Sequence, residues 1–187
     1  MISETIFHPT SSFEKSFLEQ NKRKAILVVA LASLFLSLTV FLLTSSLIYS
    51  VFAFIINIVN WFVLSGVLFF FEFVHTKKKS RKSESNFWKS ACVIGTLWEL
   101  NLFAYLVMLL SVWLIPFFSG LLADILVGLL FLFLILIAVV WLIASFRMLK
   151  VVFGVQKGKL LLNWIILMVL NSLVVSFVTN LLASLIF

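Results

Sequence analysis

Charged residues are scarce in this chain: only 11% of its 187 residues are Asp, Glu, Lys or Arg, whereas 64% are hydrophobic. About a quarter of the residues of a soluble domain are charged, so the composition excludes a soluble globular protein. Residues 25–71 carry no charge at all. As a helix this run would be about 70 Å long, more than twice the roughly 30 Å of a bilayer's hydrocarbon core. The chain is therefore predicted to cross a membrane repeatedly.

The sequence also has few cysteine and histidine residues and none of the common catalytic motifs. Cys92 is the single cysteine, which excludes an internal disulfide, and its apolar surroundings predict packing as a small hydrophobe. His8 and His75 are isolated, so no metal site is predicted. The sequence has no phosphate-cradling glycine loop and no serine flanked as a nucleophile elbow requires. We expect no catalytic residue, no cofactor and no enzymatic activity. No cleavable signal peptide is predicted, because the first apolar run is too long for a signal core.

Five apolar segments are long enough to span a bilayer as helices, the default structure where backbone groups must be satisfied within lipid. They lie near residues 25–44, 51–74, 90–115, 121–146 and 160–187. The turn after the first is placed at residues 45–50, and Pro116, Ser119 and Gly120 mark the third connection. The fourth span lacks central polar residues and is predicted to be the most lipid-exposed.

All 14 Lys and Arg fall into three groups that precede span one, separate spans two and three, and separate spans four and five. We call these groups the basic segments. Their members are Lys15, Lys22, Arg23 and Lys24; Lys77, Lys78, Lys79, Arg81, Lys82 and Lys89; and Arg147, Lys150, Lys157 and Lys159. With five spans, all three lie on one side, which the positive-inside rule makes cytoplasmic. The N-terminus is then cytoplasmic and the C-terminus outside.

Residues 1–24 are predicted to form a cytoplasmic amphipathic leader, followed by a five-helix transmembrane domain at 25–187. Ser11 and Glu14 fit a capping box, and Phe13 and Phe17 share a face that could lie in the headgroup region. The alternative is a helix that only anchors the chain.

The polybasic loop between spans two and three offers candidate binding residues for anionic lipid headgroups or an acidic partner: Lys77, Lys78, Lys79, Arg81 and Lys82. The alternative is that these charges only orient the chain. The loop lacks the interleaved aromatic residues that stack on bases, so nucleic-acid binding is not expected.

Glu99 lies about nine residues into the third span, or about 14 Å, which places it near the membrane midplane. Gly95 and Ala91 precede it at intervals of four and form a stripe of small residues that lets another helix approach closely. We therefore expect Glu99 to face protein.

No Lys or Arg is expected at this depth, and a buried acid without a cation favours its protonated form. Asn60, Asn171 and Ser37 are the candidate hydrogen-bond partners. Two interpretations remain open. Glu99 and these residues could line a wet cavity that handles a proton, an ion or a lipid headgroup, or they could join helices, at about 0.6 kcal/mol per bond.

Three stretches of the sequence resemble the Yip1 family of small five-span membrane proteins: "IFHPTSSFEKSFLEQNKRKAILV", "KSESNFWKSACVIGTLWELNLF" and "VVWLIASFRMLKVVFGVQKGKLLLNW". The resemblance implies a five-helix bundle of the prokaryotic-type branch, in the cytoplasmic membrane of a bacterium. Eukaryotic members associate with Rab GTPases, but their long N-terminal region and DLYGP-type motif are missing here. Glu99 stands where many relatives carry small residues or proline, so no role for it follows from the resemblance.

Two functions are thus expected. The first is a non-enzymatic scaffold or adaptor for membrane lipids, a membrane-protein partner or a second copy of the chain. The alternative is a small transporter, or a channel or transporter subunit, with its polar site at Glu99.

Overall fold

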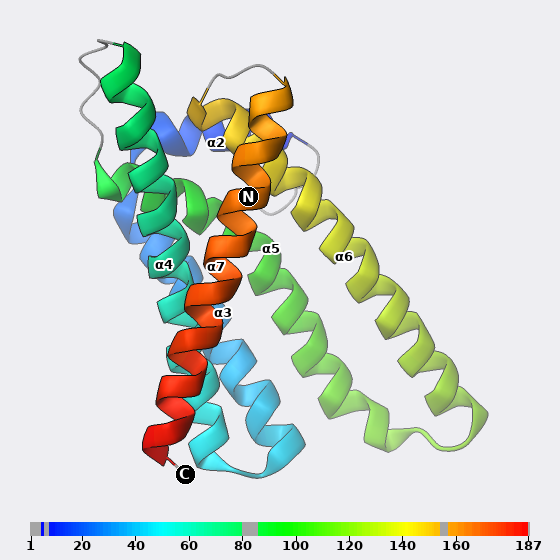
Figure 1. The fold of residues 1–187 in the computed structure, drawn as a ribbon. Coiled ribbons are helices and arrows are strands. Elements are labelled where there is room, and N and C mark those ends of the chain that lie inside the picture. Colours follow the sequence, from blue (N-terminus) through cyan, green and yellow to red (C-terminus); the bar gives the residue numbers. More distant parts are fainter. Residues whose placement is uncertain (1–4, 6–7, 80–85, 154–156, 187) are drawn as a thin grey trace.

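The computed structural model describes residues 5, 8–79, 86–153 and 157–186, and over these ranges the protein is all-helical (Figure 1). The described α-helices are α2 (Pro9–Glu19), α3 (Lys22–Thr44), α4 (Leu47–Lys79), α5 (Phe87–Leu114), α6 (Leu121–Phe153) and α7 (Lys157–Ile186). A short 3-10 helix, η1 (Ile115–Phe117), follows α5. The predicted helical fold is confirmed.

Four of these helices are long and apolar enough to cross a membrane. The spanning stretches are Lys22–Thr44, Leu47–Phe73, Phe87–Phe117 and Leu121–Val152. In α7, the described apolar stretch Leu161–Leu173 is shorter than a full span. The fifth span and the orientation of the chain therefore stay predictions.

The helices extend beyond the sequence-based boundaries, most of all at both ends of α4 and at the end of α6, which reaches Phe153 where residue 146 was predicted. Ser45 ends α3 in the left-handed region, at φ 53°, and its N–H donates to the carbonyl of Phe41 over 2.7 Å. Because α4 already begins at Leu47, the turn is shorter than predicted. At its other end α4 continues to Lys79, because a helix does not have to stop where charged residues reach the membrane surface.

The connection after α5 is confirmed as a break. Pro116 lies in η1, and Gly120 precedes α6 with φ 62°, a conformation that favours glycine.

The start of α2 differs from the predicted capping box. The helix begins at Pro9, a favoured first residue because proline has no N–H to leave unpaired. Ser11 lies inside the helix, and its hydroxyl donates to the carbonyl of His8 over 2.9 Å. The capping box of Ser11 and Glu14 is therefore wrong.

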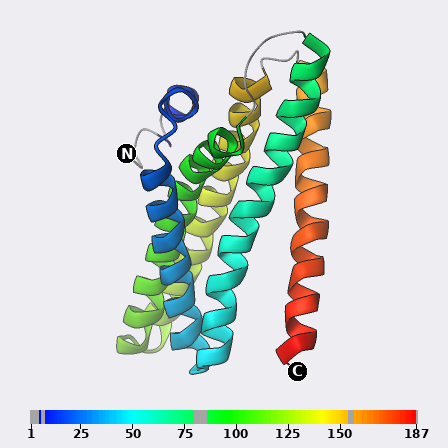
Figure 2. The same cartoon turned by 90° about the vertical axis from the view of Figure 1, so that its left-hand side faces the viewer.

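The long helices run side by side, and α2 lies across one end of them, where Figure 2 shows it almost end-on. We call this the α2 end. The starts of α3, α5 and α7 and the ends of α4 and α6 lie there, whereas the α3–α4 turn, η1 and the end of α7 lie at the opposite end (Figures 1 and 2). The helix ends that border the three basic segments thus gather at one end of the bundle.

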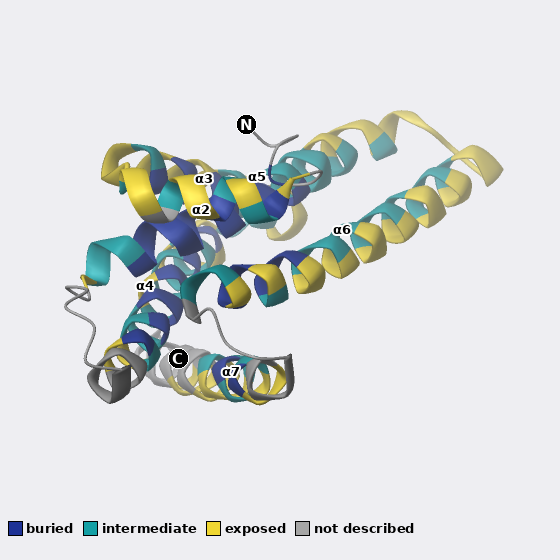
Figure 3. Cartoon of the chain, turned by 90° about the horizontal axis from the view of Figure 1, so that it is seen from above, coloured by how far each residue is buried: buried dark blue, intermediate teal, exposed yellow. Residues whose placement is uncertain are grey.

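The core forms around the first half of α5. Residues 90–100 are buried without interruption, and α3 packs against α5 more extensively than any other pair of helices packs. In contrast, α6 exposes most of its length (Figure 3), as its lack of central polar residues predicts.

Candidate functional site

Glu99 lies in α5 with 1% of its side chain exposed, and both of its carboxylate oxygens have partners from the N-terminal part of the chain. Lys24, in the first turn of α3, places its ammonium Nζ 2.7 Å from Oε1. Thr5 donates its hydroxyl to Oε2 over 2.8 Å. The expectation that no cation reaches Glu99 is therefore wrong. Glu99 lies beside the first turn of α3, which carries Lys24. Counting residues along α5 gives the position of Glu99 on its own helix but not which part of α3 lies next to it.

A close approach of two helices brings Lys24 to Glu99. A Cβ placed on Gly95 would lie 2.6 Å from the Cβ of Ala25, so α3 and α5 touch almost backbone to backbone. The predicted role of this stripe of small residues is confirmed. Lys24 precedes Ala25 and Glu99 follows Gly95 by one turn, so the contact aligns the two charges. Asn21 caps α3 by accepting from the Lys24 N–H over 3.0 Å, which fixes this first turn.

Helix α2 packs over the same region. The side chain of Phe13 is completely buried, and the hydroxyls of Ser16 and Thr96 form a hydrogen bond between α2 and α5. Leu18, five residues further along α2, is 78% exposed. One face of α2 is therefore buried against the helices, where the sequence suggested a headgroup region.

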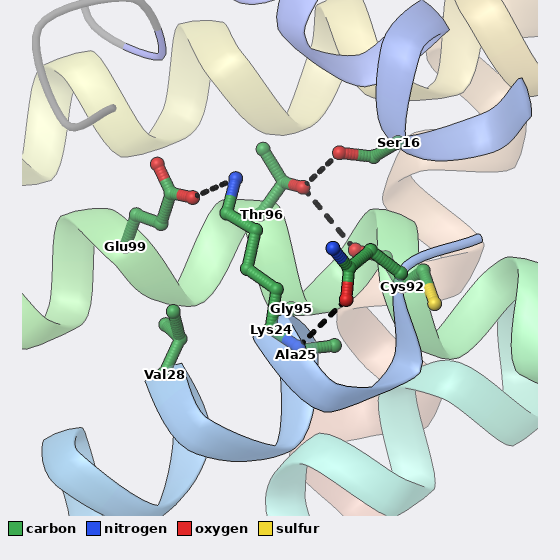
Figure 4. A pocket seen from close by; sticks show the side chains of 9 residues that line it. Ser16, Lys24, Ala25, Val28, Cys92, Gly95, Thr96 and Glu99 are labelled. Atoms are coloured by element: carbon green, nitrogen blue, oxygen red, sulfur yellow. Dashed lines mark hydrogen bonds and ion pairs between the residues drawn. The ribbon is translucent and has the colours of Figure 1, made fainter. Parts of the chain in front are cut away.

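The cavity among these groups is small. Figure 4 shows Lys24 reaching across it to Glu99, with Ser16 and Thr96 meeting on the other side. Its volume is about 10 Å³, room for a single water molecule. No group of three His, Cys, Asp or Glu residues suited to a metal ion occurs in the described part of the chain. The chemical effect of this arrangement is that Lys24 neutralises the buried Glu99 carboxylate where the helices meet. An unpaired buried charge would destabilise the protein.

The other polar residues predicted to meet Glu99 lie elsewhere. Ser37 pairs with Ser50, with 2.8 Å between their hydroxyl oxygens, and so joins α3 to α4. Asn60 and Asn171 each bury a side-chain oxygen that has no hydrogen-bond partner among the described residues. The structure does not bring these residues together with Glu99.

A separate polar network connects α3, α4 and α5. The Asn57 amide donates to Ser33 over 2.9 Å, and its oxygen accepts from the Tyr105 hydroxyl over 3.4 Å. These hydrogen bonds join three helices through polar side chains, a common way in which membrane helices associate.

A second acid and lysine meet at the α2 end. Glu72 of α4 is only 5% exposed, and its carboxylate lies 3.9 Å from the ammonium of Lys89 and accepts from Ser90 over 3.4 Å. Glu99 and Glu72, the buried acids among the described residues, thus each have a lysine at the same end of the molecule.

The side chains of the polybasic loop fall outside the described part of the structure. Lys77, Lys78 and Lys79 belong to the last turn of α4, but their side chains lie outside what the structure describes. Arg81 and Lys82 lie outside the described residues altogether.

Comparison of the chain with known proteins finds no matching family model, no similar curated protein and no similar solved structure. Membership of the Yip1 family therefore stays a prediction.

Sequence reasoning missed Lys24 and Thr5 as partners of Glu99. One signal could have found Lys24. Gly95 calls for a small residue on the facing helix, and Ala25 is a small residue at the start of the first span, directly after Lys24. Thr5 carries no comparable signal.

Proposed function

We propose that this protein is a non-enzymatic membrane scaffold or adaptor that gathers anionic lipids at its α2 end. The observation that supports this proposal best is the position of the helix ends that border the basic segments, all at one end of the bundle. Each Lys or Arg near an anionic membrane surface contributes about 1 kcal/mol of attraction. Several of them on one face therefore favour anionic lipid over neutral lipid.

The alternative function, transport through a site at Glu99, has less support. Its carboxylate is already held by Lys24 and Thr5, and the adjoining cavity has room for a single water molecule. A transport site has to exchange such contacts for a substrate or an ion. The geometry favours a joint that holds α2, α3 and α5 together.

Five spans, a cytoplasmic N-terminus and membership of the Yip1 family are parts of the same proposal. The course of α7 supports the fifth span, because it runs beside α4 from the α2 end to the opposite end (Figures 1 and 2). By the positive-inside rule the α2 end faces the cytoplasm, and the proposed location is the cytoplasmic membrane of a bacterium.

The test compares the wild-type protein with a variant in which Lys77, Lys78, Lys79, Arg81 and Lys82 are all replaced by Gln. Both are extracted in a mild detergent, and the lipids that co-purify are measured by mass spectrometry. We expect the variant to retain a markedly lower share of anionic lipid, because the surface attraction grows with each cation. An unchanged share, in a variant whose topology is intact, contradicts the proposal.

The matched control is Glu99→Gln, which removes a charge from the buried joint and none from the basic segments. We expect it to keep its share of anionic lipid. Loss of proton or ion flux in proteoliposomes of this variant, where the wild type has such flux, would instead establish the transport alternative.

A further inference from the structure

A hollow lies between α6 and α7 close to the α2 end. Its volume is about 280 Å³. The lining residues are Leu142, Ile143, Phe146 and Arg147 of α6 and Leu161 and Trp164 of α7. We call this hollow the α6–α7 groove.

The walls of the groove are apolar and face outward. Leu142, Ile143 and Leu161 are 45%, 49% and 50% exposed. Leu142 and Ile143 belong to a helix that is long and apolar enough to cross a membrane, and Leu161 begins the apolar stretch of α7 beside it. Their exposed surface would therefore meet lipid chains. The groove is thus a surface on which an acyl chain can lie without displacing any of the side chains that the structure describes.

The floor of the groove is held in place by a hydrogen bond. The Trp164 indole N–H donates to the hydroxyl of Ser145 over 2.9 Å, and Ser145 is fully buried and donates to the carbonyl of Leu142 over 2.8 Å. This chain of bonds ties α7 to α6 beneath the groove, so the shape is formed before any ligand arrives.

Arg147 is the charged residue of the groove. It is exposed, and neither an ion pair nor a side-chain hydrogen bond joins it to another described residue. Arg147 lies six residues before the end of α6, about 9 Å along the helix, a distance from which a long side chain reaches the headgroup level. A guanidinium binds phosphate through two parallel hydrogen bonds.

We propose that the α6–α7 groove is a binding site for one anionic phospholipid. Its phosphate binds Arg147, and an acyl chain lies along Ile143 and Leu161 over Trp164. This inference rests on the proposed preference for anionic lipid and assigns it to a particular site outside the polybasic loop.

A second hollow supplies an internal comparison. It lies between α5 and α6, has a volume of about 430 Å³, and is lined by Val107, Ser111, Leu126, Leu129, Leu130, Leu132, Phe133 and Leu136. None of these residues is charged, so lipid bound there would not be selected by its headgroup.

The test titrates the purified full chain in detergent with phosphatidylglycerol or with phosphatidylcholine and counts bound lipids by native mass spectrometry. We expect Arg147→Gln to weaken the tightest phosphatidylglycerol binding about fivefold, the effect of one cation near an anionic group. Phosphatidylcholine binding should not change. The comparison variant is Lys150→Gln, which removes an exposed cation of the same basic segment and the same helix that does not line the groove. It should weaken the tightest phosphatidylglycerol binding less than Arg147→Gln does, because the Lys150 ammonium attracts that lipid only across the surface and does not bind its phosphate directly.

A second pair of variants tests the acyl-chain part of the site. Ile143→Trp places a bulky ring in the α6–α7 groove and leaves Arg147 intact, and it should weaken phosphatidylglycerol binding. Leu129→Trp places the same ring in the other hollow and should leave the tightest phosphatidylglycerol binding as it is. Both replaced residues are exposed on α6, at 49% and 57%, so neither change disturbs the core.

The outcomes separate this inference from the proposed function. Equal losses in Arg147→Gln and Lys150→Gln would overturn the groove as the site and leave the general preference for anionic lipid standing. Equal affinity of the wild type for both lipids would overturn both proposals. Displacement of the lipid by inorganic phosphate, with Ile143→Trp having no effect, would overturn the acyl-chain contact and with it the site.

Discussion

At the scale of single residues, Gly95 decides how near α3 comes to α5. A side chain there would meet the Cβ of Ala25 at 2.6 Å and its Cα at 3.0 Å. Ala25 has no rotamer through which it could withdraw, so a larger residue at position 95 has to push the two backbones apart. The same movement would draw Lys24 away from Glu99.

We therefore expect Gly95→Ala to destabilise the protein by about 1–3 kcal/mol, the usual cost of overpacking a tight core. Thermal unfolding in mild detergent, followed by tryptophan fluorescence, measures the change as a lower midpoint. Gly128→Ala is the matched control, because a Cβ at Gly128 of α6 meets no atom within 4 Å. Equal midpoints for the two variants would show that α3 and α5 are not in backbone contact.

At the scale of helices, α2 is joined to the bundle by one buried face. Phe13 is completely buried, whereas Leu18 is 78% exposed. The hydrogen bond between Ser16 and Thr96 and the ion pair between Lys24 and Glu99 lie next to this contact. Phe13 thus supplies the apolar part of a mixed interface that keeps α2 across the ends of α5 and α6.

Phe13→Ala should release α2, because truncating a buried phenylalanine costs about 3–5 kcal/mol. We expect trypsin to cleave the full chain after Lys15 at least roughly tenfold faster in this variant. A loss of only about 1.4 kcal/mol in the docking of α2 already makes its released form tenfold more populated. Leu18→Ala removes an exposed side chain of the same helix and should be cleaved at the wild-type rate. Equal rates in all three proteins would mean that Phe13 does not hold α2.

The helices could be predicted from composition, but their partners could not. Long runs without charge require helices in lipid, and the small residues Ala91 and Gly95 correctly indicated a close helix contact. An amphipathic pattern such as that of Phe13 in α2, however, reads the same whether its apolar face meets lipid or protein. Likewise, counting residues along α5 gives the depth of Glu99 on its own helix but not the height at which α3 begins beside it.

At the scale of the whole molecule, the helix ends that border the basic segments share the α2 end, and the last described residue of α7, Ile186, lies at the opposite end (Figures 1 and 2). This arrangement agrees with an odd number of membrane crossings. It also separates an end bordered by the basic segments from a far side whose connections carry no Lys or Arg.

An alkaline phosphatase fused after Phe187 should consequently be active, because the enzyme matures only outside the cytoplasm, and a fluorescent protein at the same site should be dark. The same two reporters placed after Lys82 should give the reverse result. A fluorescent fusion at Phe187 would require an even number of crossings and would remove the basis for the proposed orientation.

The pairing of Lys24 with Glu99 also bears on how the protein is made. Ribosomes deliver a chain from its N-terminus, so α3 leaves the ribosome well before α5. When Glu99 enters the bilayer with α5, Lys24 is already present at the start of α3. Pairing with its ammonium lowers the free-energy cost of inserting the Glu99 carboxylate. In a permuted chain in which α5 precedes α3, Glu99 would enter the bilayer before Lys24 is available to pair with it.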